Sequence, residues 1–96
     1  MAITLDVISG YPEEIVRIAI RTSLQNELML AQYRYEQFVE ECQAFEQKYH
    51  LDSETFMRKF EGGELGDDPD FFDWFAAKRG LDIWKRQCEI LKGIQL

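Results

Sequence analysis

A long segment of the chain, from Glu13 to Tyr49, contains neither glycine nor proline. Because these two residues interrupt helices most readily, the segment is predicted to form one long helix. Pro12 precedes Glu13 and Glu14, and proline followed by acidic residues is typical of a first helical turn. We therefore expect the first helix to span residues 12–50.

A short second helix is predicted immediately after the first. Asp52 or Ser53 can cap its N-terminus, because both side chains accept hydrogen bonds from free backbone N–H groups. Gly62 and Gly63 follow nine residues later and are typical of a helix C-terminus. The short helix is therefore expected over residues 53–61.

A third helix is expected over residues 69–93. It starts at Pro69, which lies between Asp68 and Asp70, and its basic residues come later, as the helix dipole favours. Gly80 is the residue least compatible with this helix, since glycine costs about 1 kcal/mol relative to alanine in a helix interior.

Apolar residues recur along both long helices at alternating intervals of three and four, which is typical of helices that pack at a shallow angle. When the two helices are paired antiparallel, a single register places the apolar residues of the two seams opposite each other. In that register the residue numbers of each pair add up to 119. We predict an all-α fold, a long antiparallel helical hairpin with the short helix folded over its connection. The predicted pairs are Leu28–Leu91, Ala31–Cys88, Tyr35–Trp84, Phe38–Leu81, Cys42–Ala77 and Phe45–Trp74.

The first residues of the chain have a different pattern. Ile3, Leu5 and Val7 alternate with polar residues, which predicts a short extended segment over residues 1–11. One strand cannot form a sheet alone. The segment therefore either packs on the helices or pairs with another chain, and residues 1–96 are expected to form a single helical domain.

More apolar surface is present than the hairpin seam requires. A second stripe lies beside the seam of the third helix, and an apolar block opens the first helix. Either the N-terminal segment and the short helix cover this surface, or a second chain does, as in a homo-oligomer. The stripe comprises Phe72, Ala76, Ile83, Ile90 and Ile94, and the block comprises Ile15, Val16, Ile18, Ala19 and Ile20.

Eighteen acidic residues against eleven basic ones give a net charge of −7. Such a chain is a poor nucleic-acid binder, and no apolar stretch approaches the length of a membrane span. The start of the chain shows no basic and apolar leader. Cys42 and Cys88 form no disulfide framework and are expected to be reduced thiols in the core. These features together predict a cytoplasmic protein.

No catalytic or metal-binding constellation is found. The single histidine, His50, lies where the long helix ends, a position that favours interaction with the helix dipole. The acidic turn does not match a calcium-binding loop, and no glycine-rich loop suits a phosphate. We therefore expect no enzymatic activity, no metal and no cofactor.

Acidic residues concentrate between Asp52 and Trp74, where eight acids and two bases give a local charge of −6. Helix capping and solubility explain part of this run. The adjacent aromatic residues favour a docking surface for a basic protein, because acids around exposed rings can steer and anchor such a partner. Trp74 also belongs to the seam. The predicted partner-binding residues are Glu64, Asp67, Asp68, Asp70, Phe71 and Trp74.

The segment from Lys59 to Trp74 reads K-F-E-G-G-E-L-G-D-D-P-D-F-F-D-W. It resembles a signature of small acidic helical proteins of bacteria and archaea, the antitoxin halves of toxin–antitoxin pairs. The resemblance covers roughly residues 30–92. It implies a non-enzymatic antitoxin that binds and neutralises a basic, ribonuclease-like toxin. The alternative is a self-assembling helical scaffold without a toxin partner.

Overall fold

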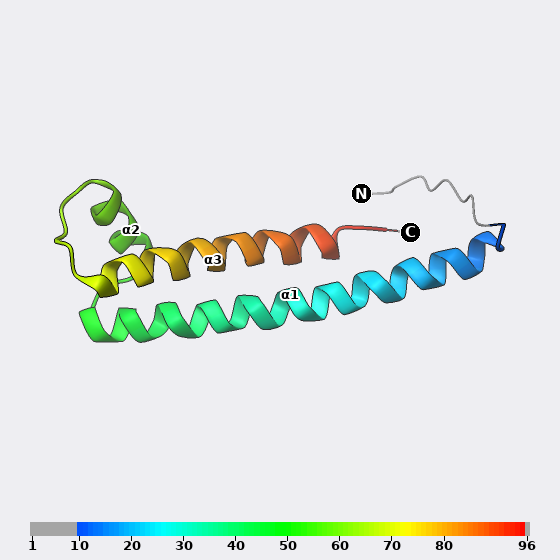
Figure 1. Cartoon of the computed structure of the whole chain (residues 1–96), viewed down its shortest axis with the longest axis horizontal. Coiled ribbons are helices and arrows are strands. Elements are labelled where there is room, and N and C mark those ends of the chain that lie inside the picture. Colours follow the sequence, from blue (N-terminus) through cyan, green and yellow to red (C-terminus); the bar gives the residue numbers. More distant parts are fainter. Residues whose placement is uncertain (1–9, 96) are drawn as a thin grey trace.

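The computed structural model describes residues 10–95, which contain three helices (Figure 1): α1 (Glu13–Tyr49), α2 (Ser53–Glu61) and α3 (Pro69–Lys92). α1 and α3 lie side by side and antiparallel, and α2 lies over the end at which they are connected. The all-α hairpin predicted from the sequence is confirmed. Of the predicted extended segment 1–11, residues 1–9 lie outside the described residues.

Each helix ends at residues suited to that position. His50 adopts a left-handed conformation at the end of α1, and its backbone N–H donates to the carbonyl of Glu46. The Asp52 carboxylate accepts hydrogen bonds from both the backbone N–H and the hydroxyl of Thr55. The Asp68 carboxylate accepts the backbone N–H of Asp70. These caps fix the two turns that reverse the chain.

The packing of α1 against α3 agrees with the predicted antiparallel register. The rings of Phe45 and Trp74, one of the predicted pairs, stack with centroids 5.7 Å apart. Cys42 and Ala77, another pair, lie in one buried cluster. Further along the hairpin, the guanidinium of Arg34 lies 4.7 Å from the ring centroid of Trp84.

Gly80, the residue least compatible with α3, lies directly against the ring of Phe38. A Cβ atom at this position would approach the ring to 2.6 Å. Glycine at this position therefore allows the two helices to pack closely around the Phe38 ring. This close packing compensates for the low helix propensity of glycine.

The core lies at the closed end of the hairpin. Phe56 of α2 and Trp74 of α3 are the largest completely buried side chains, because α2 adds a third layer there. Towards the open end, Ala31 and Cys88 are the only buried side chains among residues 10–95. α1 continues well beyond the end of α3 (Figure 1), so its first turns have no neighbouring helix among the described residues.

Within the described part of the chain, no helix combines the length and the apolar character needed to cross a bilayer.

Candidate protein-interaction site

The aromatic residues near the acidic turn form a cluster between α2 and α3. The ring of Phe56 stacks on Trp74 with centroids 3.9 Å apart and an angle of 7° between the planes. Phe60 stacks on Phe75 at 5.0 Å, and Phe71 lies 5.9 Å from Phe56. The apparent excess of aromatic residues therefore mainly fills an intramolecular core that α2 completes.

The prediction that Trp74 contacts a partner is wrong. Its side chain is completely buried, and its indole N–H donates a 2.9 Å hydrogen bond to the hydroxyl of Ser53. Trp74 belongs both to the seam and to the acidic segment, and the tertiary position of α2 decides between the two interpretations.

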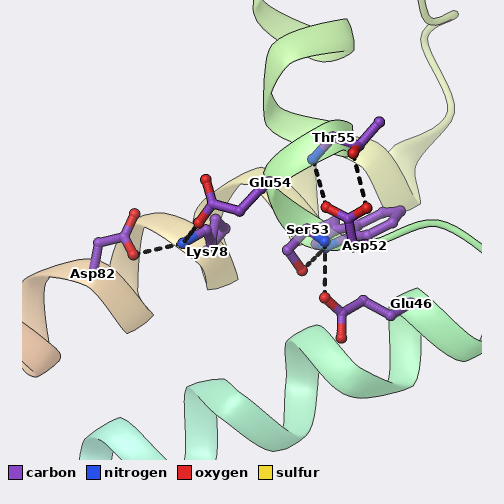
Figure 2. Close-up of polar contacts among 8 residues, drawn as sticks. Glu46, Asp52, Ser53, Glu54, Thr55, Lys78 and Asp82 are labelled. Atoms are coloured by element: carbon purple, nitrogen blue, oxygen red, sulfur yellow. Dashed lines mark hydrogen bonds and ion pairs between the residues drawn. The ribbon is translucent and has the colours of Figure 1, made fainter.

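A polar junction fixes α2 against the two long helices (Figure 2). The carboxylate of Glu46, on α1, accepts the backbone N–H of Ser53 at 2.8 Å. Lys78, on α3, is almost completely buried and forms ion pairs with Glu54 at 2.7 Å and with Asp82 at 2.6 Å. The junction therefore ties all three helices together through charge-assisted contacts.

The pKa of Lys78 reflects two opposing effects. Burial alone lowers the pKa of its ammonium group, but the hydrogen bonds to Asp82 and Glu54 outweigh burial and raise that pKa above its ordinary value. Lys78 therefore remains charged in its buried position. Sequence reasoning missed this junction, and the one available signal was the spacing of four between Lys78 and Asp82 on a helix.

An open cavity of about 270 Å³ adjoins the junction. The residues that line it include the acids Glu46 and Glu54, the cation Lys78 and the thiol of Cys42. Burial raises the pKa of Cys42, which favours the less nucleophilic thiol form. The polar side chains of this cavity thus bind one another and stabilise the fold.

Three of the predicted partner-binding residues also have intramolecular roles. The carboxylate of Asp70 accepts hydrogen bonds from Lys48 at 2.5 Å and from the hydroxyl of Tyr49 at 2.6 Å. Hydrogen bonds from Lys48 and Tyr49 lower the pKa of Asp70. Asp68 caps α3, and Phe71 packs against Tyr49 with ring centroids 5.3 Å apart. Asp70 and Phe71 therefore join the end of α1 to the start of α3.

Glu64 and Asp67 are exposed, as a partner-binding role requires. Phe72, which the sequence analysis placed in the second stripe of α3, is 54% exposed and meets Phe60 edge to face. Asp73 follows Phe72 and is also exposed. We name these residues, together with Asp68, the acidic tip. The acidic tip comprises Glu64, Asp67, Asp68, Phe72 and Asp73.

The four carboxylates of the acidic tip form no ion pair with any cation of residues 10–95. Their negative charge is thus not neutralised by a cation of these residues, in contrast to the paired carboxylates of the polar junction. The same residues contain no group of three or more acidic, histidine or cysteine side chains arranged to hold a metal ion.

Comparisons of the chain with protein-family models, with curated proteins and with solved structures found no match.

Proposed function

We propose that this chain is a non-enzymatic interaction module that binds and neutralises a basic protein, a ribonuclease-like toxin in the antitoxin interpretation of the sequence. The observation that carries the proposal is the acidic tip, in which unpaired carboxylates accompany Phe72, a half-exposed aromatic side chain. Charge and an apolar anchor are thus available on one short stretch of chain.

The two kinds of residue contribute differently to binding. The carboxylates attract a cationic surface and accelerate association, whereas a buried aromatic anchor mainly slows dissociation. A protein that cleaves RNA presents a cationic groove to phosphates. Carboxylates that occupy this groove exclude the substrate, and such inhibition needs no catalytic group on the inhibitor.

Contacts between the helices support this proposal because they fix α2 and α3, the two helices that flank the acidic turn. Lys78 and Ser53 attach α2 to α3 on one side of the acidic turn, and Lys48 attaches α3 to α1 on the other. A preorganised surface loses little conformational entropy on binding. The acidic tip is therefore carried between two anchored helices rather than on a free acidic tail.

The test compares two pairs of charge reversals in binding to a small basic ribonuclease, for which a gene next to that of this chain is sought first. The first variant carries Asp67→Lys and Asp73→Lys in the acidic tip. The matched control carries Glu27→Lys and Glu40→Lys, which are exposed on α1 and change the net charge equally. Association is measured by stopped-flow mixing at low and high salt.

We expect the tip variant to associate at least about tenfold more slowly than the control at low salt and to lose most of its salt dependence. Phe72→Ala is expected mainly to accelerate dissociation. Equal association rates for the tip variant and the control would exclude the acidic tip as the binding site.

A further inference from the structure

The N-terminal half of α1 carries an apolar stripe that the hairpin leaves uncovered. Its members Ile15, Ile18, Met29 and Tyr33 are each between 50% and 68% exposed, and Thr22 lies between them and is also exposed. We name these five residues the α1 stripe. Isolated exposed apolar residues are common, but a line of them along one helix indicates an interaction surface.

The α1 stripe lies on the side of α1 opposite the seam. At 3.6 residues per turn, its five members fall within an arc of about 60° around the helix axis. The centre of this arc lies roughly 150° around the axis from the seam that faces α3. They are the only residues between positions 15 and 33 within this arc, which therefore contains no charged residue. α3 packs on the opposite side of α1, so this face stays exposed in the single chain.

The charges of this region favour a second copy of the chain over a basic partner. Residues 10–35 have no net charge, although the whole chain carries −7. A neutral surface has no electrostatic preference for a cationic protein, and it allows two acidic chains to approach without local repulsion. The balancing residues are Glu13, Glu14 and Glu27 against Arg17, Arg21 and Arg34.

We propose that two copies of the chain pair through their α1 stripes in antiparallel orientation, centred on Thr22. In this register Ile15 of each copy lies opposite Met29 of the other, and the two Thr22 residues face each other at the centre. Ile18 lies opposite Asn26, which borders the stripe. Each Tyr33 lies over the start of the facing α1. The apolar area buried is on the order of 1,000 Å², the lower limit for a specific interface, so micromolar affinity is expected.

The antiparallel orientation also separates the two acidic ends. From Thr22 to the end of α1 the helix rises about 40 Å, so the two acidic tips lie roughly 80 Å apart. This separation is far larger than the screening length of about 8 Å at physiological salt. A parallel pair would instead bring the two acidic tips side by side and would be destabilised by their repulsion.

The first test measures the mass of the full chain by sedimentation equilibrium across the micromolar range. The parent is expected to form dimers. Ile18→Lys and Met29→Lys, both within the α1 stripe, are expected to weaken the dimer at least tenfold without loss of helical circular dichroism, because the parent side chains are exposed in the single chain. The matched control is Ile83→Lys, at an exposed isoleucine of α3, which should dimerise like the parent.

Two results would overturn the proposal. A parent chain that stays monomeric over the whole range would show that the stripe is covered within one chain or left bare. Loss of the dimer in Ile83→Lys, with retention in Ile18→Lys, would place the interface on α3 instead. Neither measurement involves the basic partner, so the outcome is independent of the proposed function.

The second test determines the orientation by disulfide trapping between two single-cysteine additions, Ile15→Cys and Met29→Cys. The native cysteines are buried, so mild oxidation should act on the added thiols. An antiparallel pair predicts disulfides between positions 15 and 29 in the mixture and none between two copies of position 15, which lie about 21 Å apart. Efficient trapping of position 15 with itself would contradict the antiparallel arrangement.

Discussion

The side chain of Ser53 has a structural role that its size does not suggest. Its hydroxyl accepts the indole N–H of Trp74, which is completely buried among Phe45, Tyr49 and Phe56. In Ser53→Ala this buried donor loses its partner, which is expected to lower the free energy of unfolding by about 1–3 kcal/mol. Urea denaturation measures this change.

The control for Ser53→Ala is Ser23→Ala on the exposed face of α1. The Ser23 hydroxyl donates to the carbonyl of Ala19 within the same helix, so its removal leaves no buried group unsatisfied. We expect a change within about 0.5 kcal/mol there. Equal effects at the two serines would show that the bond to Trp74 contributes little.

Asp70 makes the stability of the hairpin dependent on pH. Because Lys48 and Tyr49 lower the pKa of Asp70, the folded state favours its charged form. The resulting stability is present at neutral pH, above the ordinary aspartate pKa of about 4, and is lost as the pH falls through the lower pKa of the folded state. Asp70→Asn should therefore be less stable than the parent at neutral pH, and the difference should shrink in acid.

Thermal unfolding at a series of pH values measures this effect. Asp67→Asn is the matched control, because Asp67 is exposed and forms no ion pair within residues 10–95. A difference between parent and Asp70→Asn that stays constant from neutral to acidic pH would contradict the role of Asp70 as a charged acceptor.

Among the elements, α3 depends on a close contact at Gly80. Gly80→Ala improves helix propensity by about 1 kcal/mol, but the added Cβ would overlap the ring of Phe38. We expect the overlap to prevail and the variant to be destabilised by about 1–3 kcal/mol. Phe38→Leu should lower the free energy of unfolding less in the Gly80→Ala variant than in the parent. A double-mutant cycle, with each free energy measured by urea denaturation, gives this coupling. Additive effects would show that the two residues do not compete for space.

The α1–α3 hairpin could be predicted from local information, whereas the position of α2 could not. Capping residues and the spacing within each seam depend on near neighbours in the sequence, so the helix starts at Asp52 and Pro69 could be predicted. Matching the two regular seams then predicted the pairing of Phe45 with Trp74. The stacking of Phe56 on Trp74 depends on how α2 turns back over α3. That turn is fixed by contacts between distant residues.

The candidate site could be predicted only in part, because it too depends on contacts between distant residues. The sequence indicated an acidic surface for partner binding, and its members Glu64 and Asp67 are exposed in the structure. It could not separate Phe71 and Trp74, which pack inside, from Phe72, which faces solvent. These aromatic residues lie within one turn of a helix, and only the tertiary position of α2 determines which of them it covers.

In the whole molecule, the two proposed interaction surfaces lie at opposite ends of an elongated hairpin (Figure 1). The acidic tip lies at the closed end, beside the core and the polar junction. The α1 stripe starts at the open end, where α1 extends beyond α3. In the proposed dimer, pairing through the α1 stripe therefore leaves both acidic tips accessible.

Hydrogen exchange along α1 should reveal this division. Among residues 10–95, the first turns of α1 have no neighbouring helix. A helical segment with few tertiary contacts opens readily, because little opposes its fraying. We expect the amides of residues 17–24 to exchange faster than those of residues 35–45 in dilute protein. Raising the concentration should slow exchange in residues 17–24 as pairing protects them, while exchange in α3 should change little. Ile18→Lys should abolish this concentration dependence. Strong protection of residues 17–24 in dilute parent protein would instead show that a single chain stabilises its own open end.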